Sequence, residues 1–297
     1  MYETILVPID GSEHAIRAGE HARYLAHVFS ASVHLVSVAD VQAMGGMSNG
    51  DDLDEAFVER IEAEHKRAIE TSEEVFQGDS IETAVLRGAP ADAIVDYADS
   101  HSIDVIAMGT QGRTGVGRYL AGSVTESVVR RAPCPVLTTA ATERSQLDGD
   151  YDDLLIPTDG SEPAAAAVSH GIAIAEAIGA RIHGVNIIDA DALAPTPEHT
   201  APKRLLDRFK AEGERTTGKI ATRATNAGVD VTTSVREGYP TRDLLAYADA
   251  HNIDLIAMGT TGQTDLNRYL LGSTAERVIR HAEIPVLAVN ARGSMKR

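Results

Sequence analysis

The chain is an internal repeat of about half its own length. Three segments recur in the same order, with residues 5–13 returning as 154–162, residues 101–110 as 251–260 and residues 118–123 as 268–273. The offset is 149 for the first pair and 150 for the other two, so one residue was inserted between them. Solenoid and propeller repeats are only about 20–50 residues long, so this period indicates a duplicated domain. We predict a first domain at 1–141, a polar linker without periodicity at 142–150 and a second domain at 151–297.

Within each copy, short apolar runs alternate with stretches of helical periodicity. In the first copy we predict strands near 4–9, 32–38, 81–86, 103–109 and 134–140, with helices near 13–29, 52–77, 90–101 and 123–131. Continuous runs of Val, Ile and Leu, such as residues 103–108, are typical of strands covered on both faces. This alternation predicts two α/β domains, each a parallel sheet covered by helices.

The charge balance excludes several classes of partner. The chain has 44 acidic and 27 basic residues and a formal net charge of -17, which argues against binding phosphate-rich nucleic acid or anionic lipid. Of the basic residues 22 are Arg and 5 are Lys, and only 4% of the chain is aromatic. This composition favours a halophilic protein from a high-salt cytoplasm, with an ordinary acidic bacterial protein as the alternative.

The sequence also indicates where the protein is located and what its single cysteine can do. The amino terminus lacks the basic start and apolar core of a signal peptide, and no apolar stretch approaches the ~20 residues of a membrane span. We therefore expect a cytoplasmic protein with no membrane partner. The single cysteine, Cys134, excludes an intramolecular disulfide and a cysteine-cluster metal site, and its apolar neighbours predict that it is buried.

Two unusual segments lie where α/β domains bind ligands, beyond the carboxyl ends of strands. The first is the turn Pro8-Ile9-Asp10-Gly11-Ser12, which joins the first strand to the first helix. The second is the glycine-rich loop 109–123, which leads from the fourth strand into the fourth helix. Glycines allow close approach to a phosphate, and successive N–H groups at a helix start attract anions. Ser123 adds a hydroxyl, and Arg113 and Arg118 add positive charge.

Both segments also have purely structural interpretations. Ser123-Val124-Thr125-Glu126 and Ser273-Thr274-Ala275-Glu276 have the pattern of a capping box, and Asp10 suits a helix cap. A Walker loop is excluded because no Lys separates Gly122 from Ser123, and Leu120 stands where a dinucleotide fingerprint requires Gly. Because the whole loop recurs with its spacing intact, we favour phosphate binding.

The glycine spacing resembles that of the ATP-binding members of the universal stress protein family. Their loops carry Gly, two residues, Gly, nine residues, Gly and then Ser or Thr. Here these are Gly109, Gly112, Gly122 and Ser123, and again Gly259, Gly262, Gly272 and Ser273. The resemblance extends over essentially both copies. It implies two tandem five-stranded parallel sheets of order 3-2-1-4-5, sandwiched by helices and adenine nucleotide alpha-hydrolase-like, with a nucleotide between the first and fourth strands of each.

The resemblance also implies which residues would contact ATP, or another adenine nucleotide, and its phosphate-bound Mg²⁺. Asp10 and Asp159 would face the ribose or the metal, and Val38 and Ile187 the adenine, although Val38 equally suits a core strand. The implied contacts of the first domain are Pro8, Ile9, Asp10, Val38, Met108, Gly109, Gly112, Arg113, Gly122, Ser123, Val124 and Thr125. Those of the second are Thr158, Asp159, Ile187, Met258, Gly259, Gly262, Gly272, Ser273 and Thr274.

The second copy departs from the first inside the loop. Gln263 stands in place of Arg113, Asp265 in place of Gly115 and Asn267 in place of Gly117. An acid beside a triphosphate and a lost countercharge predict weaker binding at the second site, by about 1–3 kcal/mol.

Three kinds of function remain, and we favour a regulator that binds ATP. Efficient catalysis is not expected, because Asp10 is the only candidate base and the loops carry no His or Lys motif, although slow ATP hydrolysis stays open. The 11 histidines show no metal-binding spacing, and His101 and His251 are predicted to cap helix ends. A nucleotide-free dimerising scaffold is the other alternative, disfavoured because both copies keep the glycine pattern.

The last strand of each copy predicts the assembly. Residues 135–139 and 285–289 are apolar edge strands, which are an aggregation hazard when left open. Single-domain relatives pair such strands across a dimer, so the resemblance implies an intramolecular pseudo-dimer. A further homodimer and a protein partner that responds to the nucleotide are open expectations.

Overall fold

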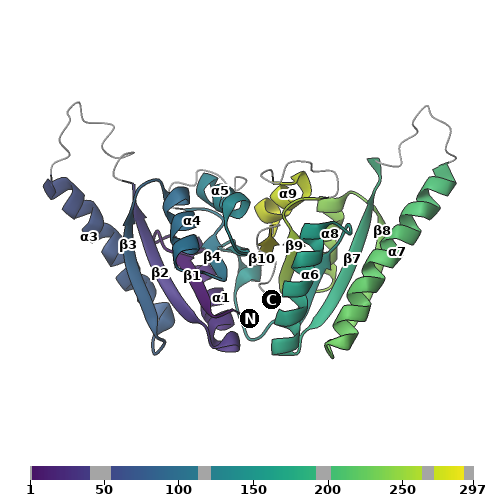
Figure 1. The fold of residues 1–297 in the computed structure, drawn as a ribbon, viewed down its shortest axis with the longest axis horizontal. Helices are drawn as coiled ribbons and strands as arrows, with labels where there is room; N and C mark the ends of the chain where they lie inside the picture. The colour runs from purple at the N-terminus through teal and green to yellow at the C-terminus, as the bar shows by residue number, and fades with distance from the viewer. Residues whose placement is uncertain (1, 41–54, 113–121, 192–201, 263–270, 291–297) are drawn as a thin grey trace. The chain divides into compact units, whose positions relative to one another are not determined.

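The computed structural model describes residues 2–40, 55–112, 122–191, 202–262 and 271–290. The chain divides into two compact units, Met1–Leu147 and Asp148–Arg297 (Figure 1). The first contains β1 (Thr4–Pro8), α1 (Glu13–Phe29), β2 (Ser32–Ala39), α3 (Glu55–Ser72), the 3₁₀ turn η1 (Glu73–Phe76), β3 (Ile81–Arg87), α4 (Pro90–Ser100), β4 (Val105–Gly109), α5 (Ser123–Arg131), β5 (Val136–Thr139) and η2 (Glu143–Ser145). The second contains β6 (Asp153–Pro157), α6 (Glu162–Ile178), β7 (Arg181–Asp189), α7 (Pro202–Asn226), β8 (Val231–Gly238), α8 (Pro240–Ala250), β9 (Leu255–Gly259), α9 (Ser273–His281) and β10 (Val286–Val289).

Each unit contains the same five-stranded parallel sheet. In the first unit β1 pairs with β2 and β4, β2 with β3, and β4 with β5, which gives the order β3-β2-β1-β4-β5. In the second the order is β8-β7-β6-β9-β10. The predicted α/β fold with strand order 3-2-1-4-5 is confirmed. In each unit the order reverses beside the first strand, so a ligand crevice is expected at its carboxyl end.

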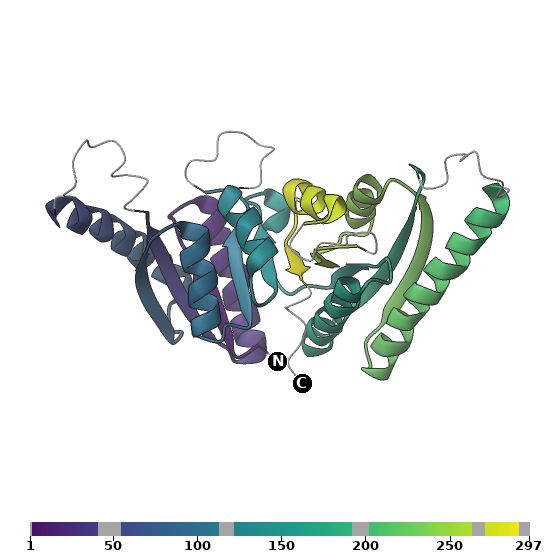
Figure 2. The same ribbon diagram turned by 45° about the horizontal axis from the view of Figure 1, so that its top comes forward.

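Small residues let the helices approach the sheets closely. On α1 the buried residues Ala15, Ala18, Ala22 and Ala26 recur every three or four positions, which places them on one face. That face packs against β1, β4 and β5, while α4 and α5 pack against each other. In the second unit α6 packs in the same way against β6, β9 and β10, and Figure 2 shows the long helix α7 running along β7 and β8. Alanine therefore does much of the packing in this aromatic-poor chain.

The predicted capping boxes at Ser123 and Ser273 are wrong. Helices α5 and α9 begin at these serines, and their N-caps are Gly122 and Gly272. Glycine has no side chain that accepts hydrogen bonds from the N–H groups of the first turn. The cap of α1 is Ser12, whose hydroxyl accepts from the Ala15 N–H, so Asp10 is not the cap either.

Two smaller predictions are confirmed. His101 and His251 lie at the ends of α4 and α8, where Nδ1 is 3.0 Å and 2.9 Å from the carbonyl oxygens of Tyr97 and Tyr247. Each imidazole also stacks on that tyrosine ring, at centroid distances of 3.8 Å and 3.9 Å. Cys134 is a buried free thiol.

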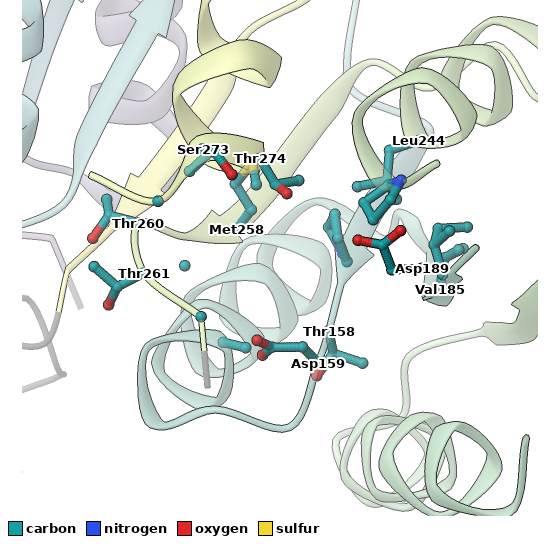
Figure 3. Close-up of a pocket in the computed structure, with 18 residues that line it drawn as sticks. Thr158, Asp159, Val185, Asp189, Leu244, Met258, Thr260, Thr261, Ser273 and Thr274 are labelled. Carbon is teal, nitrogen blue, oxygen red and sulfur yellow. The ribbon is translucent and has the colours of Figure 1, made fainter. Parts of the chain in front are cut away.

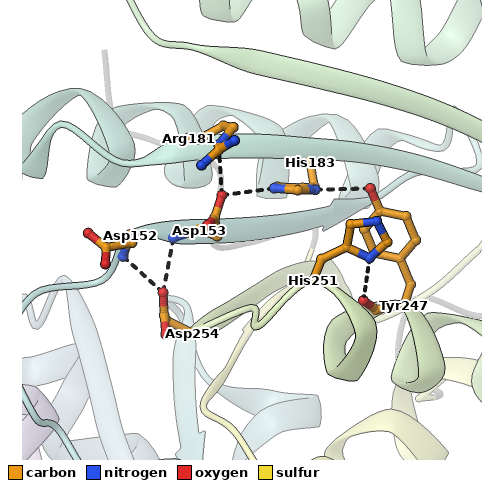
Figure 4. Close-up of polar contacts among 7 residues, drawn as sticks. All are labelled: Asp152, Asp153, Arg181, His183, Tyr247, His251 and Asp254. Atoms are coloured by element: carbon orange, nitrogen blue, oxygen red, sulfur yellow. Dashed lines mark hydrogen bonds and ion pairs between the residues drawn. The ribbon is translucent and has the colours of Figure 1, made fainter.

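A polar network joins the amino-terminal ends of β6 and β7 (Figure 4). The Nε2 of His183 lies 2.9 Å from Asp153 Oδ1, and its Nδ1 lies 2.9 Å from the Tyr247 hydroxyl. Asp254 Oδ2 accepts from the backbone N–H groups of Asp152 and Asp153, at 2.9 Å and 3.0 Å, and burial raises the pKa of this carboxyl. These residues lie at the opposite ends of the strands from the predicted ligand crevice, so we assign them to the fold.

The segment that follows β5 is attached to the first unit. Thr142 and Ser145 form a capping box around η2, within the predicted linker 142–150. The buried His21 on α1 donates from Nε2 to the Ser145 carbonyl at 2.9 Å. His14, in the first turn of the same helix, accepts the Ala141 N–H at Nδ1 at 3.1 Å. Part of the predicted linker is therefore ordered on α1.

His21 predicts a loss of stability in acid. Burial lowers its pKa to about 4, whereas the unfolded chain has the ordinary value of about 6.5. Between these values the unfolded state binds more protons, so its stabilising contribution is complete above about pH 6.5 and is lost as the pH falls towards 4. We expect His21→Gln to reduce the loss between pH 7.5 and pH 5 by about 2 kcal/mol, measured by urea unfolding. Exposed His281→Gln is the control, and an equal loss in His21→Gln and the wild type would contradict this assignment.

Candidate functional site

Two turns meet at the carboxyl ends of the neighbouring first and fourth strands of each unit. In the first unit the Ser12 hydroxyl donates to the Gln111 carbonyl at 3.4 Å, which links the turn after β1 to the loop after β4. In the second unit Ser161 donates to the Thr261 carbonyl at the same distance. The two copies thus build the same corner with equivalent residues.

The acids in the turns that follow the first strand of each copy, Asp10 and Asp159, face this corner. Asp10 Oδ1 accepts the Ser12 N–H and Asp159 Oδ1 accepts the Ser161 N–H, both at 2.9 Å. Such turns, in which an Asp side chain binds the backbone two residues ahead, hold the carboxylate in one orientation. The second oxygen of Asp10 lies against Gly112, where an added Cβ would be 2.5 Å away. Gly112 is therefore small because the carboxylate occupies the adjacent space.

The loop after the fourth strand is closed by its own backbone. The Gly122 N–H donates to the Thr110 carbonyl at 2.6 Å, and Gly272 donates to Thr260 at 2.8 Å. These bonds bring the first turn of α5 or α9 beside the end of β4 or β9. In the first unit the buried Thr125 hydroxyl donates to the Gly109 carbonyl at 2.7 Å. Because the Thr125 hydroxyl already donates its proton to this carbonyl, a ligand would accept a hydrogen bond from the Thr125 backbone N–H instead.

The first glycine of the loop has a packing role. A Cβ at Gly109 would be 2.6 Å from the His14 Cβ and 2.7 Å from the His14 carbonyl carbon. A Cβ at Gly259 would be 2.7 Å from both the Ala164 nitrogen and the Pro163 carbonyl carbon. Real Cβ atoms essentially never approach this closely, so α1 and α6 begin too near the strand for any side chain. The close packing of α1 and α6 therefore explains Gly109 and Gly259 without a ligand.

The second unit has a pocket of about 340 Å³ at this corner (Figure 3). All nine residues predicted for the second site line it, namely Thr158, Asp159, Ile187, Met258, Gly259, Gly262, Gly272, Ser273 and Thr274. The other lining residues are Pro157, Ala164, Val185, Asp189, Pro240, Leu244, Thr260, Thr261 and Ala275. The structure therefore brings together residues that are more than a hundred positions apart in the sequence.

The two sides of the pocket differ in chemistry. Figure 3 shows Thr260 and Thr261 on one side and Val185, Asp189 and Leu244 on the other. The first side adds the glycines and the start of α9, which present backbone N–H groups and hydroxyls. The second is mainly aliphatic, with one carboxylate. Such a pocket suits a ligand with a flat, largely apolar end and an anionic end.

Nine lining residues were not predicted from the sequence, and three of them, Pro240, Leu244 and Asp189, lie on the aliphatic side. Pro240 and Leu244 lie in the first two turns of α8, which follows β8. The predicted site segments follow β6 and β9, so no local pattern in them marks these two residues. Asp189 ends β7, and Asp40 stands at the same position of the first copy, at the offset of 149. Aligning the two copies would have revealed this repeated acid.

The residues predicted for the first site lie at the equivalent strand ends and helix start, except those outside the described residues. In the first unit Pro8 is the last residue of β1, Met108 is the penultimate residue of β4, and Ser123 and Val124 begin α5. The Ile9 N–H donates to the Val36 carbonyl, and the Ser37 hydroxyl donates to the Ile9 carbonyl at 2.6 Å, beside Val38. In the second unit Asn186 makes the equivalent bond to Thr158 at 2.7 Å. Arg113, Arg118, Gln263, Asp265 and Asn267 lie outside the described residues.

Two negative findings apply to the described part of the chain. None of its helices combines the length and apolarity needed to cross a membrane. None of its His, Cys, Asp and Glu side chains gather in threes or more around a potential metal position.

Comparisons with known proteins agree with this architecture. The model of the universal stress protein family matches residues 1–139 and again residues 150–290. A universal stress protein of Methanocaldococcus jannaschii is 37% identical over 139 residues, which cover 47% of this chain and 82% of that protein. Another from Thermus aquaticus is 37% identical over 144 residues, covering 46% and 98%. The crystal structure of a universal stress protein from Archaeoglobus fulgidus, at 19% identity, has a TM-score of 0.70 and covers 97% of this chain and 98% of its own, which shows a common fold.

Proposed function

The chain belongs to the universal stress protein family, and on this basis we propose that it is a regulatory protein that binds ATP with Mg²⁺ at the carboxyl edge of each sheet. The observation that carries the proposal is the second unit's pocket. Its volume of about 340 Å³ falls within the range of about 300–1,000 Å³ typical of small-molecule sites. It also lies at the strand-order reversal, where open α/β sheets bind ligands.

We place the phosphates of the nucleotide at the start of α9. Its N-cap is Gly272, and Ser273 and Thr274 form the first turn and line the pocket. N–H groups at a helix start, uncapped by a side chain and assisted by the helix dipole, are suited to phosphate oxygens. The same arrangement begins α5 at Gly122 and Ser123, which supports an equivalent site in the first unit.

The electrostatics of the pocket support a requirement for Mg²⁺. Among the described lining residues the charged side chains are Asp159 and Asp189, and both are acidic. Carboxylates repel a bare triphosphate, but Mg²⁺ is commonly held between one or two carboxylates and the phosphates of a nucleotide. Asp159 lies beside the glycine loop and suits this role, with Asp10 as its equivalent. We propose that chelating Mg²⁺ weakens ATP binding.

The same lining favours regulation over turnover. Phosphoryl transfer needs a positioned base and cationic groups on the leaving phosphates. The described lining has no His, Lys or Arg, and Asp159 is committed to the turn at Ser161. We propose that ATP instead biases a conformation or assembly that a protein partner recognises. It also remains a prediction that the protein is cytoplasmic, that its two domains form a pseudo-dimer and that two chains form a homodimer.

Thermal unfolding tests the binding itself. A ligand that binds only the folded state at about 100 times its Kd stabilises by about 2.7 kcal/mol. For domains of this size the unfolding midpoint then rises by roughly 5–10 °C. We expect this rise with ATP and Mg²⁺, a smaller one with ATP and a chelator, and none with inorganic triphosphate alone. The absence of any rise at saturating ATP and Mg²⁺ would reject the proposal.

A further inference from the structure

Asp189 places a carboxylate on the aliphatic side of the second unit's pocket. It is the last residue of β7 and lines the pocket together with Val185, Ile187, Pro240 and Leu244. Figure 3 shows it near Val185 and Leu244, away from Thr260 and Thr261. Under the proposed function this side receives the base, because the phosphates lie at the start of α9. An acid there faces the edge of the base rather than the phosphates.

The backbone around Asp189 holds this carboxylate in place. Its Oδ1 accepts the Asp191 N–H at 2.9 Å, which closes a turn of the kind that orients Asp10 and Asp159. The next residue, Ala190, donates its N–H to the Gly238 carbonyl at 2.8 Å and so ties the end of β7 to the end of β8. The carboxylate is therefore an oriented group, although its side chain is exposed.

The chemistry of a carboxylate discriminates between bases. It accepts hydrogen bonds and donates none, so it pairs with the exocyclic amino group of adenine and repels a carbonyl oxygen in the same position on guanine. Guanine has an alternative, in which its ring N–H and amino group bind two carboxylate oxygens together. One oxygen of Asp189 already serves the Asp191 N–H, which favours a contact through the other oxygen alone.

We infer that Asp189 selects adenine at the second site by accepting a hydrogen bond from its amino group. This inference rests on the proposed function, since it assumes that the pocket binds a nucleotide. Asp40 directly follows β2 at the equivalent position of the first copy and has the same role in the first site. Because the carboxylate is exposed, water weakens the discrimination, and we expect a preference of about ten- to a hundredfold rather than the far larger values of buried sites.

The test compares the affinities of three Mg²⁺-bound probes, namely ATP, GTP and the triphosphate of purine riboside, which is ATP without its amino group. The wild type is expected to bind ATP at least about tenfold more tightly than either analogue. In the double variant Asp40→Asn/Asp189→Asn, an amide can donate to the guanine carbonyl, so the gap between ATP and GTP shrinks to about threefold or less. Asp191→Asn removes a similar charge two residues away and should keep the wild-type preference.

The outcomes separate this inference from the proposed function. An unchanged ratio of ATP to GTP affinity in the double variant would overturn the role of the two acids and leave nucleotide binding standing. Tighter binding of GTP than ATP by the wild type would also overturn it, in favour of guanine recognition. Failure of all three probes to bind the folded wild type would overturn the proposed function itself.

Discussion

Ser123→Glu and Ser273→Glu are each expected to abolish nucleotide binding in one domain without unfolding it. Each serine is the first residue of a helix whose N-cap is glycine, beside the loop closed at Thr110 or Thr260. Glutamate in the first turn stabilises a helix by about 0.3–1 kcal/mol through the helix dipole. The same charge, placed where phosphates are expected, repels them by several kcal/mol, at least about a hundredfold in affinity.

The control for these variants adds the same charge at the other end of the sheet. Gln77 is exposed and follows η1, before the amino terminus of β3. Gln77→Glu is nearly isosteric and should leave the affinity unchanged. Circular dichroism and urea unfolding check that each serine variant is folded. Wild-type affinity in a folded Ser123→Glu/Ser273→Glu double variant would show that the helix starts do not meet the phosphates.

The single variants also compare the two sites. Ser273→Glu leaves only the first site, and Ser123→Glu leaves only the second. The substitutions at Gln263 and Asp265 predict that the remaining site is weaker in Ser123→Glu, by about 1–3 kcal/mol or roughly ten- to a hundredfold. Equal affinities in the two single variants would contradict this asymmetry.

Gly109→Ala is expected to destabilise the first unit strongly in the absence of any ligand. The added Cβ would lie 2.7 Å from the backbone of His14, and a backbone atom cannot rotate away as a side chain can. Overpacking of this kind costs typically about 1–3 kcal/mol, and here the start of α1 must move. Urea unfolding of the nucleotide-free protein measures the loss. Gly259→Ala should behave alike in the second unit, because its Cβ would meet the Ala164 nitrogen at 2.7 Å.

A glycine elsewhere provides the matched control for this prediction. Gly218 lies within α7, and an added Cβ there would have no neighbour within 4 Å. Gly218→Ala should therefore stabilise the second unit by about 0.5–1 kcal/mol, because alanine favours a helix. Unchanged stability in Gly109→Ala would mean that the contact with α1 is readily relieved and that the glycine serves the ligand instead.

Much of the fold follows from local patterns that tertiary packing did not override. The run at residues 103–108 predicts β4, found at Val105–Gly109, and the helix predicted at 13–29 is α1 with the same bounds. The strand prediction rests on a continuous apolar run and the helix prediction on helical periodicity, and both patterns reflect burial. The capping boxes failed because the pattern of Ser followed by Glu does not reveal whether the serine precedes or opens the helix.

The candidate site was predictable where it repeats and hidden where it depends on packing. The loop glycines and the acid after the first strand recur in both copies, and in the second unit Gly259, Gly262, Gly272 and Asp159 line one pocket. Pro240 and Leu244 reach that pocket only because α8 begins beside the end of β7, which no local spacing encodes. The packing role of Gly109 was equally hidden, since the neighbour that excludes a side chain is His14 on another element. The contacts with ATP themselves remain predictions.

Calorimetric titration of ATP with Mg²⁺ tests the central claim most directly. The protein should first be freed of any co-purified nucleotide, and the titration run at high salt to suit its acid excess. The account predicts two binding events per chain in the wild type, one in each single serine variant and none in the double variant. A folded, nucleotide-free wild type that binds no ATP would contradict the account and favour the nucleotide-free scaffold.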